Sequence, residues 1–150
     1  MKCLILYESA HGNTERIARA IGASIQGEVQ VMRVSEGGDK ISGVQVLIVG
    51  APTYGGKAMP PVQEFLERIP EGTLKGIRTA AFDTRLKSRF AAVFGFAAPK
   101  IAAALEAKGG TPFIGPEGFI VKATKGPLVE GEEERAAAWG KTISGKLAAA

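Results

Sequence analysis

The chain contains one cysteine and one histidine among its 150 residues. A single cysteine cannot form an intramolecular disulfide, and it excludes every metal site that is built from several cysteines. Cys3 lies in the first apolar run of the chain, where a buried structural thiol is expected rather than a reactive one. The sequence therefore predicts neither a disulfide-stapled fold nor a metal centre.

Long hydrophobic runs are also missing. No apolar run approaches the ~18 residues of a membrane span. The five apolar residues between Lys2 and Glu8 are too few for the core of a signal peptide. We therefore expect a cytoplasmic protein without a membrane span. The length and the apolar content of 45% predict one domain, residues 1–150, with a core of its own.

The charge is basic but dispersed. The net charge is +4, yet Lys and Arg form no block of five or six like charges, so we expect no nucleic-acid partner. The one acidic run, 132–134, stands at the start of a predicted helix, where carboxylates favour the helix dipole. No paired carboxylates and no Ser-His-Asp set are visible, so we assign no catalytic residue.

Apolar runs alternate with helical patterns along the whole chain. Ile17, Ile21 and Ile25 form one helical stripe, and Val62, Phe65, Leu66 and Ile69 form another. Strands are predicted at 2–7, 29–34, 44–50, 77–82 and 118–123, with a short piece at 112–114. Helices are predicted at 13–25, 60–69, 97–108 and 132–147.

This alternation predicts an α/β fold, a three-layer sandwich in which helices cover both faces of a five-stranded parallel sheet. In such sheets the ligand lies beyond the carboxyl ends of the strands, where the strand order reverses. For the order 2-1-3-4-5 the reversal lies between strands one and three. The turns at 9–14 and 51–57 meet there.

The first turn, "SAHGNT", is rich in hydrogen-bond donors. Ser9, Asn13 and Thr14 add side-chain donors to the free backbone N–H groups of a helix N-terminus, and Gly12 permits close approach. We interpret this turn as a phosphate site that uses little Lys or Arg. A plain helix cap is the alternative, since Asn and Thr are good caps. The P-loop pattern is absent, which argues against ATP hydrolysis.

Two further segments follow strands at the same edge. In "APTYGGK", 51–57, the ring of Tyr54 could stack on a planar ligand, and the two glycines could let a backbone peptide reorient at little steric cost. The alternative is that this segment is only a tight turn. "DTRL", 83–86, offers backbone groups and one carboxylate, unless it is only a solvated loop.

These motifs resemble flavodoxins. "LILYESAHGNTERIARAI" is similar to their first strand, phosphate loop (usually T/S-x-T-G-x-T) and helix, and "VGAPTYGGKAMPPVQEFL" is similar to their second flavin loop. The resemblance covers nearly the whole chain and implies a flavodoxin-like fold with noncovalent FMN. By position, the implied phosphate residues are Ser9, His11, Gly12, Asn13 and Thr14. The residues implied for the ribityl chain and ring are Pro52, Thr53, Tyr54, Gly55 and Gly56, with Lys57 flanking the flavin and with Asp83, Thr84 and Arg85 on the pyrimidine side.

The sequence departs from the flavodoxin pattern at three places. His11 stands where Thr is usual, so it is either a phosphate or ribityl contact or an exposed loop residue. Strand four ends in "FDTRL", which leaves the second stacking aromatic open among Phe90, Phe94 and Phe96. Lys57 and the net charge differ from the acidic character that is typical of flavodoxins.

The resemblance implies an FMN-binding electron-transfer protein that shuttles electrons between redox partner proteins, a reductase and an acceptor. Two alternatives remain. One is an NAD(P)H- or quinone-linked flavin reductase, and the other is an interaction domain that keeps the fold without flavin.

Overall fold

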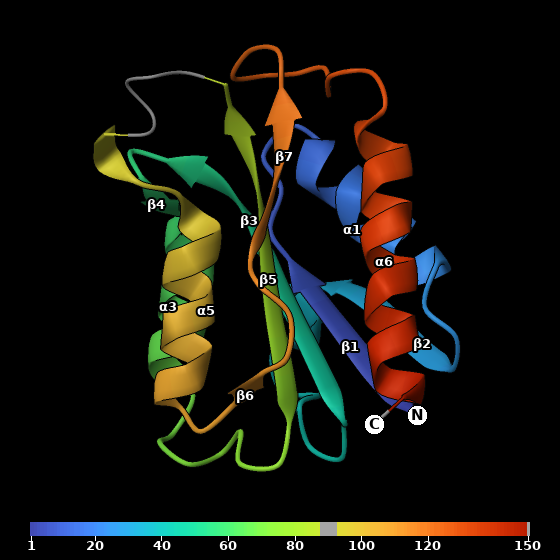
Figure 1. The fold of residues 1–150 in the computed structure, drawn as a ribbon. Coiled ribbons are helices and arrows are strands. Elements are labelled where there is room, and N and C mark those ends of the chain that lie inside the picture. Colours follow the sequence, from blue (N-terminus) through green and yellow to red (C-terminus); the bar gives the residue numbers. More distant parts are fainter. Residues whose placement is uncertain (88–92, 150) are drawn as a thin grey trace.

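A parallel sheet forms the centre of the molecule, with helices on both of its faces (Figure 1). The computed structural model describes residues 1–87 and 93–149. The long strands are β1 (Lys2–Tyr7), β2 (Glu28–Arg33), β3 (Val46–Tyr54), β5 (Arg78–Leu86) and β7 (Glu117–Val121). Their order is β2-β1-β3-β5, with the short β6 (Thr111–Pro112) and then β7 paired in parallel along β5. The predicted order 2-1-3-4-5 is confirmed.

The helices lie in two layers. On one face are α1 (Asn13–Ala23) and α6 (Glu132–Ala148), and on the other are α3 (Pro60–Arg68) and α5 (Ala97–Ala107) (Figure 1). A single turn, α2 (Val34–Gly37), follows β2. Among the described residues, no helix is both long enough and apolar enough to cross a membrane.

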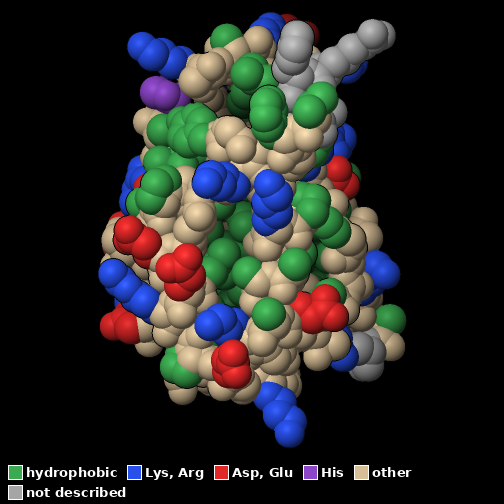
Figure 2. All heavy atoms as spheres, turned by 90° about the vertical axis from the view of Figure 1, so that its left-hand side faces the viewer, with side chains coloured by type: hydrophobic (Ala, Val, Ile, Leu, Met, Phe, Trp, Pro, Cys, Tyr) green, Lys and Arg blue, Asp and Glu red, His purple; other side chains and the backbone are tan. Residues whose placement is uncertain are grey.

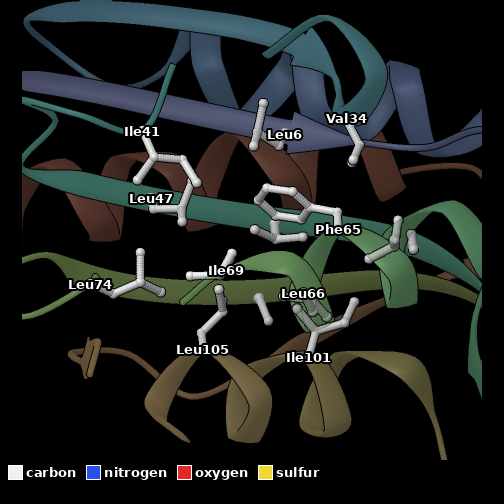
Figure 3. Packing of buried hydrophobic residues seen from close by; sticks show 14 of the residues in the cluster. Leu6, Val34, Ile41, Leu47, Phe65, Leu66, Ile69, Leu74, Ile101 and Leu105 are labelled. Carbon is white, nitrogen blue, oxygen red and sulfur yellow. The ribbon is translucent and has the colours of Figure 1, made fainter. Parts of the chain in front are cut away.

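Each face of the sheet has its own core. Between the sheet and α3 and α5, side chains such as Leu47, Phe65 and Ile101 interdigitate (Figure 3). The opposite core holds three mutually packed rings, with centroids 6.2–6.3 Å apart in edge-to-face geometry, from Phe82, Phe119 and Trp139. Cys3 also lies in this core, and burial raises the pKa of its thiol to about 12, as expected for a structural cysteine.

Two strands extend beyond their predicted ends. β3 continues to Tyr54 because its last residues pair with the two-residue strand β4 (Lys57–Ala58). β5 continues to Leu86 because 82–86 pairs with β7. The prediction that 83–86 forms a loop is therefore wrong. Polar residues marked the end of the strand in the sequence, but here their side chains are buried with partners.

The short elements are the ones that sequence patterns missed. Residue Val34, predicted to end a strand, begins α2. Neither α2 nor β4 is long enough to show a hydrophobic period. The predicted piece at 112–114 corresponds to the two-residue strand Thr111–Pro112, which shares only Pro112 with it because Phe113 and Ile114 lie outside the strand.

Candidate functional site

A cavity of about 330 Å³ opens at the carboxyl ends of β1, β3 and β5. It lies where the strand order reverses, at the upper edge of the sheet in Figure 1. Its volume is within the range of small-molecule sites. The lining residues are Ser9, Ala10, His11, Asn13, Thr14, Pro52, Thr53, Tyr54, Gly55, Gly56, Thr84, Arg85, Leu86, Phe94, Val121 and Thr124.

The first wall is the turn between β1 and α1. Gly12 precedes the helix with φ of 89°, and its N–H donates to Ser9 Oγ at 3.0 Å. The backbone N–H groups of Asn13 and Thr14 have no acceptor among the residues that the structure describes. Free N–H groups at a helix N-terminus, together with the helix dipole, favour the binding of an anion.

The turn is more than a helix cap. No side chain caps α1, because Asn13 and Thr14 occupy its first turn rather than the cap position. Thr14 is 1% exposed, and its hydroxyl lies 2.8 Å from that of Thr84 in β5. Asn13 packs against Gly126, where an added Cβ would lie 2.7 Å from Asn13 Oδ1. The helix start is therefore fixed to two neighbouring segments.

The second wall is the hairpin between β3 and β4. Gly55 and Gly56 both have positive φ, 55° and 82°, a conformation that side chains disfavour. An added Cβ on Gly56 would lie 2.2 Å from the Phe94 carbonyl oxygen. Lys100 Nζ donates to the carbonyls of Gly56 and Phe94, at 2.5 and 3.2 Å. The hairpin is therefore held against the start of α5.

The third wall is the end of β5, where two charged residues have different roles. Asp83 is fully buried and accepts two bonds from Arg85, at 2.7 and 2.8 Å, and one from the Ala98 N–H, at 2.8 Å. The Arg85 guanidinium carbon lies 3.6 Å from the ring centroid of Phe96. The same guanidinium packs against the backbone of Gly118, where a side chain would collide with it. Asp83 thus fixes Arg85 and the N-terminus of α5.

Three residues predicted for the site lie outside the cavity lining. Asp83 lies beneath it and contacts Arg85 instead. Lys57 is exposed on β4, and Gly12 acts through its backbone conformation. The other predicted residues line the cavity, and these are Ser9, His11, Asn13, Thr14, Pro52, Thr53, Tyr54, Gly55, Gly56, Thr84 and Arg85. The exposed His11 is among them.

The structure adds residues that the sequence reasoning did not assign. Val121 and Thr124 line the cavity from the end of β7. Their position after a fifth parallel strand was the one available signal. Of the three aromatic candidates, Phe94 lines the cavity, Phe96 packs on Arg85, and Phe90 lies outside the described residues.

A charged network supports the base of the first turn. Arg33 binds Glu8 at 2.6 Å and the Ser9 carbonyl at 3.2 Å. The Arg19 guanidinium, followed by the Tyr7 hydroxyl, lowers the pKa of Glu15. Burial, and then Glu15, raises the pKa of Tyr7. The carboxylates beside the anion site are therefore paired with arginines.

The family model described as "Flavodoxin domain" matches residues 4–111. This chain belongs to the flavodoxin family. A relative named flavodoxin from Clostridium saccharobutylicum is 28% identical over 156 residues, which cover 98% of each chain.

Solved structures share the fold. A flavodoxin from the domain Archaea superposes with a TM-score of 0.76 at 23% identity, covering 99% of each chain. Rubredoxin oxygen:oxidoreductase from Desulfovibrio gigas superposes with a TM-score of 0.77 at 24% identity. That match covers 99% of this chain and 36% of the larger protein.

FMN is the cofactor of this family. The residues of the cavity fit it: unpaired N–H groups on one wall suit a phosphate, while Tyr54 and Phe94 offer aromatic surface to a planar ring. Thr84 and Arg85 add polar side chains to the lining of the same cavity. The donor set and the apolar ring surface match the two ends of FMN.

We expect Tyr54→Ala to weaken FMN binding by about 2- to 10-fold and to brighten the fluorescence of the bound flavin. An aromatic contact adds about 0.5–1.5 kcal/mol beyond area burial, and the phenol quenches an excited ring that it stacks on. A fluorescence titration measures both effects. Tyr54→Phe is the control and should retain most of the affinity. Unchanged binding and fluorescence in Tyr54→Ala would assign the stacking role to another residue, with Phe94 next to be tested.

Proposed function

We propose that this flavodoxin is an electron carrier between redox partner proteins, a reductase and an acceptor. The observation that carries the proposal is the pairing of two different walls across one cavity: the anion-binding turn at 9–14 and the aromatic and glycine hairpin at 54–56. Bound FMN supplies the chemistry, which is the acceptance and release of electrons.

The chain's own residues bind, orient and shield the cofactor in this proposal. The turn at 9–14 would hold the phosphate, and Arg85, fixed by Asp83, would offer its guanidinium to the polar groups of the ring. Tyr54 and Phe94, 37% and 65% exposed, lie at the mouth of the cavity. A ring held between them keeps one edge near the surface, where another protein can reach it.

The polar groups of the described cavity lining favour a carrier over an enzyme. Among residues 1–87 and 93–149 no group of His, Cys, Asp and Glu side chains is placed to hold a metal ion. Among the described residues no carboxylate lines the cavity, and Asp83 is fully buried and paired with Arg85. His11 is the one lining side chain of the ordinary acid–base type, and no second such group accompanies it in the described lining.

Anaerobic mixing of the FMN-loaded protein with NADH or NADPH tests the proposal. We expect the flavin absorbance to stay unchanged with either nucleotide alone, and to bleach when a flavodoxin reductase is added. The reduced protein should then pass electrons to a haem protein. Steady nucleotide consumption by the pure protein, with a quinone as acceptor, would identify a reductase instead. A colourless protein that FMN cannot reconstitute would identify an interaction domain.

A further inference from the structure

We propose that the mouth of the cavity is a docking surface for an acidic protein, the reverse of the charge pattern that flavodoxins typically present. The inference rests on the proposed carrier function and specifies its partner. The surface, called here the basic rim, consists of exposed apolar side chains surrounded by lysines. Its members are Tyr54, Lys57, Leu86, Lys87, Val93, Phe94, Lys122 and Lys125.

The centre of the basic rim is apolar and open to solvent. Val93 and Phe94 are 77% and 65% exposed, and Leu86 and Tyr54 are each 37% exposed. These four account for all but one of the large hydrophobic side chains that are exposed in the described residues, the other being Met1. Tyr54, Leu86 and Phe94 all line one cavity, so the exposed apolar surface gathers at its mouth. Gathered apolar surface of this kind marks an interaction site.

The border of the basic rim is positive. Lys87 follows Leu86 directly, Lys57 pairs with Tyr54 across the hairpin, and Lys122 and Lys125 flank the lining residue Thr124. The stretches 84–105 and 118–129 contain no acidic residue. The upper end of the molecule in Figure 2 shows mainly hydrophobic and basic side chains on the face turned to the viewer.

These lysines are available to a partner. Every ion pair among the described residues is made by an arginine, and none by a lysine. Carboxylates near this edge, Glu8, Glu15 and Glu133, are paired with arginines. The exposed Glu64 and Glu67 share a surface groove with Tyr54 and Lys57 and so lie at one side of the basic rim, away from Lys87, Lys122 and Lys125 in the sequence. Complementary charge at an interface accelerates association and selects partners.

An acidic protein fits this surface better than a nucleic acid does. Four exposed lysines surround an apolar centre, and apolar contact is the usual core of a protein–protein interface. A nucleic-acid site relies on a continuous track of phosphate contacts instead. The expected partner therefore carries carboxylates around a small apolar patch, next to its own redox centre.

Two small haem proteins of opposite charge are suitable probes: the acidic soluble domain of cytochrome b5 and the basic cytochrome c. Binding is measured by fluorescence anisotropy between 20 and 500 mM salt, and electron transfer by stopped flow from the reduced, FMN-loaded protein. Each haem iron accepts one electron and passes from ferric to ferrous. We expect cytochrome b5 to bind at low salt and to lose at least tenfold in affinity and rate at high salt. Cytochrome c should show the opposite trend in rate.

A matched pair of double variants separates the effect of the basic rim on binding from the effect of the net charge. The double variant Lys87→Glu with Lys125→Glu should weaken the low-salt affinity for cytochrome b5 by about tenfold or more. Lys75→Glu with Lys108→Glu makes the same change of charge near the amino ends of the strands, where Leu74 N–H donates to the Lys108 carbonyl, and should change binding less than twofold.

Three binding results would overturn the inference. Equal losses in the two double variants would show a net-charge effect without a docking surface. Tighter binding of cytochrome c, or stronger binding of a DNA oligonucleotide than of cytochrome b5, would identify a different partner. The binding arm needs no electron transfer, so it also separates the two proposals. Binding as expected without transfer would refute the carrier function alone, and transfer without rim-dependent binding would refute the docking surface alone.

Discussion

Riboflavin is expected to bind this protein at least a hundred-fold more weakly than FMN. The N–H groups at the start of α1 face the cavity without an acceptor among the described residues, and the phosphate supplies one. Each buried donor left unpaired costs about 1–3 kcal/mol, so two such donors cost about 2–6 kcal/mol. The middle of that range, about 4 kcal/mol, exceeds the ~2.7 kcal/mol of a hundred-fold change. Calorimetric titration of the apoprotein with both flavins measures the ratio.

Two glycine variants show whether the turn causes this preference. Gly12 and Gly43 have similar positive φ, 89° and 81°, and an added Cβ at either would meet nothing within 4 Å. Alanine therefore strains both backbones by about 1–2 kcal/mol without a clash. Gly12→Ala should reduce the preference for FMN over riboflavin, whereas Gly43→Ala, far from the cavity, should leave it intact. Similar affinities of the unmodified protein for the two flavins would show that this turn does not bind the phosphate.

Phe82→Ala is expected to lower the free energy of unfolding of the apoprotein by about 3–5 kcal/mol. Phe82 is fully buried, meets Phe119 and Trp139 edge to face, and lies over Gly50 of the neighbouring strand. An added Cβ on Gly50 would lie 2.1 Å from this ring, so the site is already filled and cannot collapse without a void.

Phe94→Ala is the matched control for that prediction. It makes the same substitution at a side chain that is 65% exposed, where a change within about 0.5 kcal/mol is expected. Urea unfolding of both variants without flavin gives the comparison. Equal destabilisation by the two substitutions would contradict the assignment of Phe82 to the core of the sheet.

The fold and the first two walls of the site were predictable from the sequence for physical reasons. Strands buried on both faces are uniformly apolar, and the helices carry clear apolar stripes, so their alternation predicts a parallel sheet covered by helices on both faces. The turn at 9–14 and the hairpin at 54–56 combine glycines with polar or aromatic residues directly after strands. In the structure both segments line the same cavity.

The third wall was less predictable because its polar residues are satisfied by partners distant in the sequence. Asp83 suggests a solvated loop until its bonds to Arg85 and to the start of α5 are known. Thr84 is buried because it meets Thr14, 70 residues away. Lys57, expected beside the flavin, lies outside the cavity lining, since the β3–β4 pairing places it at the exposed position of strand β4.

Titration of the ¹⁵N-labelled apoprotein with FMN, followed by amide NMR, tests the central claim most directly. We expect saturation at one FMN per chain, with the largest shifts at the amides of the turn 9–14 and the hairpin 54–56. The amides of Lys75 and Gly76, at the opposite edge of the sheet, should not move. A spectrum that FMN leaves unchanged, or shifts confined to that opposite edge, would contradict an FMN site in this cavity.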